Sequence, residues 1–271
     1  MPLIDSGTRK IGLALGGGGA RGFTHLGVAK ALRELQVPIG YIAGTSIGAI
    51  IGAAIASDML QWILNWTQEP DWFKLPGLAT KFFLPRRAIL GTKKIEAFFK
   101  KIVYAKTFDD LVIPFAAVAT DLQTGGRVVM TSGDVRSAIR ASMAIPGVFE
   151  PIERDGRVLV DGGLVNPLPV DVCRQLGATR VIAVDLNTCP VSESSTRSLK
   201  SMNIVDITDK AFEIIGQNLT QQLLEKSPPD LLLRPDVADV KVLDFRHGER
   251  LVQRGYECLM DQKDKVLELV A

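Results

Sequence analysis

The stretch Gly16-Gly17-Gly18-Gly19-Ala20-Arg21-Gly22 follows the apolar run Ile11–Leu15, and Gly44-Thr45-Ser46-Ile47-Gly48 follows a second apolar run at residues 41–43. Each glycine motif therefore stands between a short apolar segment, typical of a buried strand, and a longer segment with helical spacing. Two such strand–loop–helix units in succession are typical of a wound sheet of parallel strands. The sequence thus predicts an α/β fold with a mainly parallel sheet.

The rest of the chain continues this alternation of short apolar runs and helical stretches. We expect strands at residues 11–15, 41–45, 114–119, 127–131, 157–160, 180–185 and 230–233. We expect helices at residues 23–35, 47–57, 93–104, 134–144, 169–176, 204–226 and 249–269. No internal repeat or clear boundary divides the 271 residues, which predicts a single domain over residues 1–271.

One segment, residues 58–92, interrupts the alternation. It holds all three tryptophans of the chain, Trp62, Trp66 and Trp72, and the basic pair Arg86-Arg87. Several prolines exclude one long helix here. Two interpretations remain open for this excursion. It either covers the core, or it forms a lid or interfacial patch, since tryptophan and cationic side chains suit a membrane boundary.

The composition limits the functional classes. A formal net charge of +2 does not favour broad nucleic-acid binding. The three cysteines, Cys173, Cys189 and Cys258, lie far apart and form no C-x-x-C pair, which indicates a reducing compartment. Residues 1–10 are polar and lack the apolar core of a signal peptide. We therefore expect a cytoplasmic protein.

The first glycine motif has two interpretations. Gly17-x-Gly19-x-x-Gly22 matches the dinucleotide-binding pattern, but the next strand ends at Thr45 and carries no acidic residue for a ribose. Glycines also let backbone N–H groups turn toward one point, where a helix N-terminus favours an anion. We therefore expect an oxyanion hole and no cofactor. Arg21 is a supporting residue, a contact to a substrate anion, or an ordinary solvated arginine.

The second motif has the G-x-S-x-G form, which places a serine hydroxyl on a tight turn between a strand and a helix. Ser46 is therefore the candidate nucleophile, and it needs a group that accepts its proton. His25 lies on the helix after the glycine loop, and His247 stands in a charged segment near the C-terminus. Asp161 ends an apolar strand before Gly162-Gly163, which predicts a position at the carboxyl edge of the parallel sheet. This pattern favours Asp161 as the base and leaves His247 open.

Three motifs in this order, Gly-Gly-Gly-x-Arg-Gly, G-x-S-x-G and Asp-Gly-Gly, resemble those of the patatin-like phospholipase family. Residues 142–149 and the tail at residues 228–255 are also similar to segments of its small bacterial members. The resemblance implies a three-layer α/β/α fold, a Ser46–Asp161 dyad without histidine, and no metal. It also implies an oxyanion hole from Gly17, Gly18 and Gly19, with supporting motif residues Arg21, Gly22, Gly44, Gly48, Gly162 and Gly163.

The same resemblance implies an enzyme that hydrolyses lipid acyl esters through an acyl-serine intermediate. The expected substrate is a phospholipid or another fatty acyl ester, because the family spans phospholipases, lysophospholipases and general acyl hydrolases. Two alternatives stay open: an acyltransferase that uses the same dyad, and a regulatory binding protein with low turnover. Transient contact with a membrane surface also stays open, and the oligomeric state is not predicted.

Overall fold

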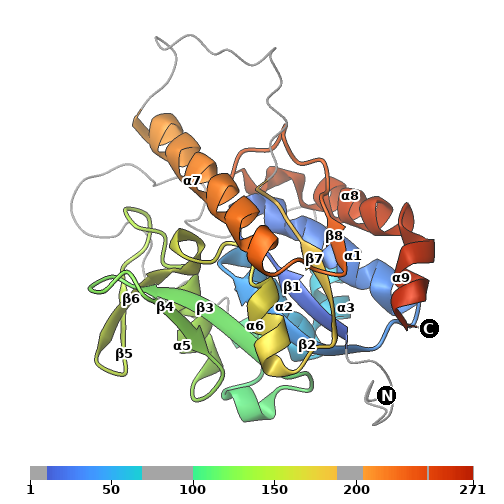
Figure 1. Cartoon of the computed structure of the whole chain (residues 1–271), viewed down its shortest axis with the longest axis horizontal. Coiled ribbons are helices and arrows are strands. Elements are labelled where there is room, and N and C mark those ends of the chain that lie inside the picture. The colour runs from blue at the N-terminus through green and yellow to red at the C-terminus, as the bar shows by residue number, and fades with distance from the viewer. Residues whose placement is uncertain (1–10, 69–99, 188–203, 243, 271) are drawn as a thin grey trace.

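The computed structural model describes residues 11–68, 100–187, 204–242 and 244–270, which form a central sheet with helices on both faces (Figure 1). The three-layer α/β/α arrangement expected from the sequence is confirmed. No helix within these ranges is long and apolar enough to cross a membrane. Cys173 and Cys258 are free thiols, and Cys189 lies outside the described residues.

Eight strands of the described residues form the sheet. They are β1 Ile11–Leu15, β2 Ile39–Thr45, β3 Phe115–Asp121, β4 Arg127–Met130, β5 Ile152–Arg154, β6 Arg157–Asp161, β7 Arg180–Val184 and β8 Leu231–Leu233. Hydrogen-bonded neighbours follow the order β5-β6-β3-β2-β1-β7-β8, and β4 pairs with β3. The pairs among β3, β2, β1, β7 and β8 are parallel, and this group is the parallel half. β4, β5 and β6 pair antiparallel and form the antiparallel half, which joins the parallel half at β3.

Strand β3 pairs with β2 over its first residues and with β6 over its last. Val118 pairs with Thr45, the last residue of β2, and Ala119 pairs with Asp161, the last residue of β6. Because β2 runs parallel to β3 and β6 runs antiparallel to it, the C-terminal ends of β2 and β6 are level with successive residues of one strand.

Backbone hydrogen bonds place β2 and β6 along the same edge of β3. Ile42 N–H in β2 donates to Pro114 O, and Leu122 N–H donates to Val158 O in β6. Alternate residues of a strand turn their N–H and C=O groups to the same edge, and residues 114 and 122 are an even number of positions apart. The C-terminal ends of β2 and β6 therefore face each other. Asp161 therefore lies at the carboxyl end of the parallel strand β2, the edge expected for it, although its own strand β6 runs antiparallel to β3.

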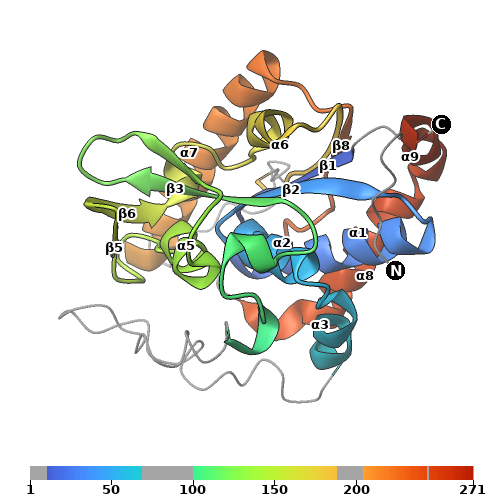
Figure 2. The same ribbon diagram turned by 90° about the horizontal axis from the view of Figure 1, so that it is seen from below.

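Helices cover both faces of this sheet. They are α1 Phe23–Glu34, α2 Ile47–Ala56, α3 Leu60–Thr67, α5 Val135–Ser142, α6 Val170–Leu176, α7 Ile204–Lys226, α8 Gly248–Met260 and α9 Lys263–Val270. Short 3-10 turns lie between them: η1 Gly19–Gly22, η2 Phe108–Asp110, η3 Gly162–Leu164 and η6 Phe245–His247. Figure 2 shows α6 and α7 on one face, and α1, α2, α5 and α8 on the other.

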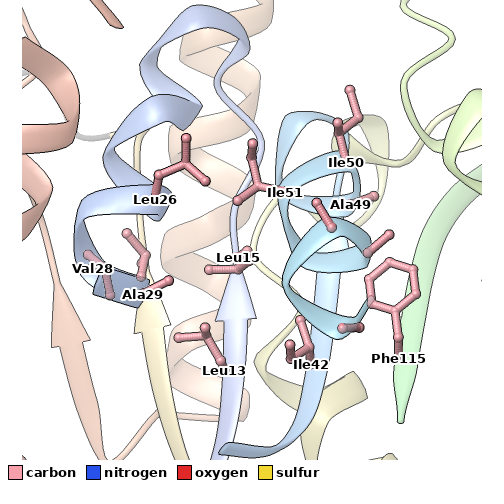
Figure 3. Close-up of a cluster of buried hydrophobic side chains, with 14 of the residues drawn as sticks. Leu13, Leu15, Leu26, Val28, Ala29, Ile42, Ala49, Ile50, Ile51 and Phe115 are labelled. Atoms are coloured by element: carbon pink, nitrogen blue, oxygen red, sulfur yellow. The ribbon is translucent and has the colours of Figure 1, made fainter. Parts of the chain in front are cut away.

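The two faces of the sheet pack differently because strand side chains alternate. Leu13, Leu15 and Ile42 point toward the face covered by α1 and α2 and belong to a large aliphatic cluster (Figure 3). The opposite face is lined by small residues such as Ala14 and Ala43, which pack in a second cluster with residues of α6. The small side chains allow α6 to lie close to the sheet.

Two elements differ from the sequence expectation. The patterns do not predict β5, which pairs with β6 through a turn at Asp155 and Gly156. These two residues have φ angles of 51° and 72°, which are typical of a two-residue hairpin turn. The helix expected at residues 249–269 is two helices, α8 and α9, and neither glycine nor proline marks the break at residues 261–262.

Most of the aromatic excursion expected at residues 58–92 lies outside the described residues, and so does most of the helix expected at 93–104. The described part of the excursion forms α3. There Trp62 and Trp66 stack with their ring centroids 6.2 Å apart, and Trp62 is 39% exposed. Gln61 accepts a hydrogen bond from Arg33, in the last turn of α1. The two tryptophans therefore lie by the end of α1 that is remote from the glycine loop.

Candidate active site

Ser46 stands on a strained turn between β2 and α2. Its φ and ψ of 56° and −122° are unusual for a residue with a side chain, and such strain is common at functional sites. The turn is also crowded, because a Cβ on Gly44 would lie 2.3 Å from Gly48 O. A Cβ on Gly48 would lie 2.1 Å from Leu15 O. Both motif glycines are therefore required for the close approach of β2, α2 and β1.

The Ser46 hydroxyl is paired with the carboxylate of Asp161. Ser46 Oγ donates to Asp161 Oδ2 at 2.6 Å, and the exposed fractions of the two residues are 7% and 6%. The other carboxylate oxygen, Oδ1, accepts the Gly163 N–H at 2.7 Å. Burial raises the pKa of Asp161 to about 6, although the hydrogen bonds from Ser46 and Gly163 act to lower it. Asp161 is therefore a stronger base than an ordinary aspartate.

A second serine, which the sequence analysis did not single out, connects the serine turn to strand β3 at this point. Ser46 N–H donates to Ser142 Oγ at 3.0 Å, and the Ser142 hydroxyl donates to Val118 O in β3 at 2.6 Å. Ser142 is fully buried at the end of α5. Ser142 lies within residues 142–149. The sequence signal that could have identified it is a polar residue at the end of a helix face that is otherwise apolar.

Asp161 is held from both sides by backbone contacts. Its N–H donates to Ala144 O at 3.0 Å, and its C=O accepts the Thr120 hydroxyl at 2.8 Å. A Cβ on Gly162 would lie 2.2 Å from Val118 O, so the turn after Asp161 runs directly against β3. The carboxylate is therefore fixed in position relative to Ser46.

The segment from Asp161 to Pro167, here called the connecting segment, contacts both glycine motifs. The Thr45 hydroxyl donates to Asn166 O at 2.8 Å, which ties the end of β2 to this segment. Gly17 N–H donates to Pro167 O at 3.0 Å, which ties the glycine loop to it. One stretch of seven consecutive residues thus positions the candidate base, the serine turn and the glycine loop relative to one another.

The glycine loop has two free donors between two anchors. Its anchors are Gly17 N–H, which Pro167 O accepts, and Ala20 N–H, which donates to Val242 O at 2.7 Å. Within the described ranges, no backbone acceptor takes the N–H of Gly18 or Gly19. The sequence analysis assigned three oxyanion donors, and the hydrogen bond of Gly17 to Pro167 leaves Gly18 and Gly19 as the available pair.

Gly19 adopts a conformation that other residues rarely take. Its φ is 56°, and a Cβ at this position would lie 2.2 Å from Val242 O. A side chain here would therefore push the loop away from the segment that anchors Ala20.

The two histidines lie in other hydrogen-bonding environments. His25 is fully buried, and its Nε2 lies 2.8 Å from Gly16 O, so it supports the backbone before the glycine loop. Burial lowers the pKa of His25 to about 4, although its bond to Gly16 acts to raise it, and the ring is therefore neutral at pH 7. His247 Nε2 lies 3.3 Å from Asp244 in η6. Among the described residues, the hydrogen-bond partner of Ser46 Oγ is Asp161, not a histidine.

Arg21 is neither solvated nor directed toward the serine. It is 5% exposed, its Nη1 donates to Glu213 Oε1 of α7 at 2.8 Å, and its Nε donates to Val240 O at 2.8 Å. The solvated arginine considered in the sequence analysis is therefore wrong, and the supporting role agrees with the contacts. No three His, Cys, Asp or Glu side chains come together as a metal site in the part of the chain that the structure describes.

Comparison with known proteins gives a consistent family assignment. The family model described as Patatin-like phospholipase matches residues 13–174, more than half of the chain. An uncharacterized NTE family protein of Mycobacterium bovis, Mb1092c, is 41% identical over 182 residues, which cover 67% of this chain and 50% of that protein. Patatin-like phospholipase domain-containing protein 6 of Homo sapiens is 30% identical over 272 residues, which cover 91% of this chain and 20% of that protein.

A solved structure supports the fold independently of sequence. VipD from Legionella pneumophila aligns with a TM-score of 0.54 over 97% of this chain and 66% of that chain, at 15% identity. At this identity the likeness concerns the fold alone. The chain spans about half the length of the mycobacterial relative and about a fifth of the human one.

Proposed function

The chain belongs to the patatin-like phospholipase family, and from this premise we propose that it is a lipid acyl hydrolase that works through a Ser46–Asp161 dyad. The observation that carries the proposal is the 2.6 Å hydrogen bond from Ser46 Oγ to a buried Asp161 carboxylate. The substrate class is a phospholipid or another fatty acyl ester, in keeping with the family name.

In the acylation step, Asp161 Oδ2 takes the proton of Ser46 as Oγ attacks the ester carbonyl carbon. The carbonyl π bond opens, and its oxygen becomes an oxyanion. The N–H groups of Gly18 and Gly19 then bind that oxyanion, while Gly17 anchors the loop. Donors of this kind are each worth about 3–4 kcal/mol of transition-state stabilisation. When the tetrahedral intermediate collapses, the bond to the alcohol breaks, and the alcohol leaves with the proton from Asp161.

In the deacylation step, Asp161 takes a proton from a water molecule that attacks the acyl-serine. The same two N–H groups bind the second oxyanion. Collapse of this intermediate releases the fatty acid, and the proton returns to Ser46 Oγ. The raised pKa of Asp161 supports both steps, because a base works best when its pKa lies near the working pH.

A fluorophosphonate probe tests this assignment together with turnover of a p-nitrophenyl ester. We expect the wild type to be labelled and active, and Ser46→Ala to lose labelling and at least about 10³-fold of its turnover. His247→Ala is the control and keeps wild-type activity. An inactive His247→Ala, or labelling that survives in Ser46→Ala, would contradict the dyad.

A further inference from the structure

Arg21 joins the glycine loop to a helix far along the chain. Its N–H donates to Gly18 O at 3.2 Å, which closes the turn that carries Gly18 and Gly19. Its buried side chain leaves this turn and donates to Glu213 of α7 and to Val240 O, each at 2.8 Å. A shift of the Arg21 side chain would therefore move the turn that holds the two free N–H groups.

Glu213 is a carboxylate held in a largely buried position. Its side chain is 10% exposed, and its second oxygen, Oε2, accepts Lys210 Nζ at 2.8 Å. Burial acts to raise the pKa of Glu213, but the hydrogen bonds from Lys210 and Arg21 outweigh it and hold the pKa below its usual value. A buried ion pair adds little stability compared with apolar residues of the same size. Stability alone therefore does not account for a charge at this position.

We propose that Glu213 is a positioning residue, which fixes Arg21 and thereby aims the Gly18 and Gly19 N–H groups at the oxyanion. This inference rests on the proposed function, because it assigns Glu213 to the same acyl-transfer step. It also implies that Arg21 does not bind a substrate phosphate, since its guanidinium is buried and donates to Val240 O and Glu213. The effect of Glu213 should then appear with a substrate that has no phosphate.

The test uses p-nitrophenyl butyrate, a neutral ester, and the variant Glu213→Gln. We expect kcat to fall on the order of 10-fold to 100-fold, because a displaced loop stabilises the oxyanion less well. KM should stay within about two-fold, because the loop acts on the transition state and not on the bound ester. Glu225→Gln is the matched control, since Glu225 lies exposed on the same helix, and it should behave as the wild type.

Two further variants keep the test decisive. Glu213→Asp retains the charge on a shorter side chain, so it measures positioning even if Glu213→Gln fails to fold, and its kcat should lie between those of the wild type and Glu213→Gln. The double variant Arg21→Lys/Glu213→Gln should lose no more kcat than the more impaired single variant, because the two residues act as one unit. Melting curves establish that each variant is folded.

The outcomes separate the inference from the function on which it rests. If the wild type is active and both Glu213 variants keep wild-type kcat, the positioning role is overturned. The positioning role is also overturned if Glu213→Gln changes KM but not kcat. It is overturned as well if the kcat loss of the double variant equals the combined losses of Arg21→Lys and Glu213→Gln. If the wild type itself neither hydrolyses the ester nor reacts with a fluorophosphonate, the proposed function fails and the role of Glu213 fails with it.

Discussion

The parallel and antiparallel halves of the sheet contribute different parts of the candidate site. The parallel half ends in two glycine-rich turns, which carry Ser46 and the N–H groups of Gly18 and Gly19. The antiparallel half contributes one carboxylate, Asp161, at the end of a strand that runs the other way. The parts meet because β2 and β6 share an edge of β3 and face each other. In this mixed sheet the carboxyl ends of two strands meet end to end along a third strand. In a purely parallel sheet the carboxyl ends of neighbouring strands would lie side by side.

The largest expected effect comes from removing the proposed base, which the antiparallel half contributes. Asp161→Asn keeps the shape of the side chain but removes the base, and we expect kcat to fall about 10³-fold to 10⁴-fold, as for loss of a triad aspartate. Ester turnover at saturating substrate measures it. Asp155→Asn makes the same change in the β5–β6 turn, at a φ of 51° that asparagine tolerates, and should leave kcat unchanged. A large loss in Asp155→Asn would mean that the hairpin, not the carboxylate, is what matters.

A smaller effect is expected where Ser142 ties the serine turn to β3, the strand at which the two halves join. Ser142→Ala removes the acceptor of the Ser46 N–H and the donor to Val118 O, and leaves both groups buried. We expect the free energy of unfolding to fall by about 1–3 kcal/mol and kcat to fall about 10-fold. Urea unfolding and ester turnover measure the two effects. Ser57→Ala, which removes a hydroxyl at the other end of α2, should leave kcat at the wild-type value.

The pH dependence of turnover reports the environment of the antiparallel half. Burial raises the pKa of Asp161 to about 6, and only the ionised carboxylate accepts the serine proton. The value of kcat/KM should therefore be half-maximal near pH 6 and fall about 10-fold for each unit below it. A profile that stays flat down to pH 4 would show that the base has an ordinary pKa.

The last expected effect concerns stability: the substitution of Asp161 that lowers kcat should raise the free energy of unfolding. The pKa of Asp161 is higher in the folded protein than in the unfolded chain, so ionisation of Asp161 destabilises the fold as the pH rises through about 6. Asp161→Asn should therefore raise the free energy of unfolding by about 2 kcal/mol at pH 8, after allowance for a weaker hydrogen bond to Ser46. Denaturant unfolding should show no such gain at pH 4. If Asp161→Asn were less stable than the wild type at pH 8, the claim that the ionised, buried carboxylate destabilises the fold would be contradicted.

The comparison of the two halves also explains what the sequence could predict. Ser46 and the glycine loop follow from local patterns, because a buried strand, a tight turn and a helix lie next to one another in the chain. The pairing direction of β6 depends on contacts between residues more than 30 positions apart, which leave no local pattern. The strand-end pattern and the family resemblance therefore pointed to Asp161 and to its edge of the sheet, but not to the antiparallel direction of the strand that carries it.

Supporting residues were harder to predict than reacting ones. Ser142, Asn166 and Glu213 act through hydrogen bonds to residues distant in the sequence, and isolated polar residues of this kind are common in any sequence. His25 shows the reverse problem, because its residue type suggests chemistry while its full burial and its contact with Gly16 O give it a packing role.

The connecting segment has a consequence for how the family can diverge. Because Asp161, Asn166 and Pro167 each hold a different part of the site, inserting or deleting one residue between them would move all three parts at once. Homologous chains that keep the chemistry should therefore conserve the length of this segment even where its residues change. The far longer stretch between Ser46 and Asp161 is free to gain or lose residues in its turns. Across the family, the number of residues in this segment should therefore be more strongly conserved than their identities.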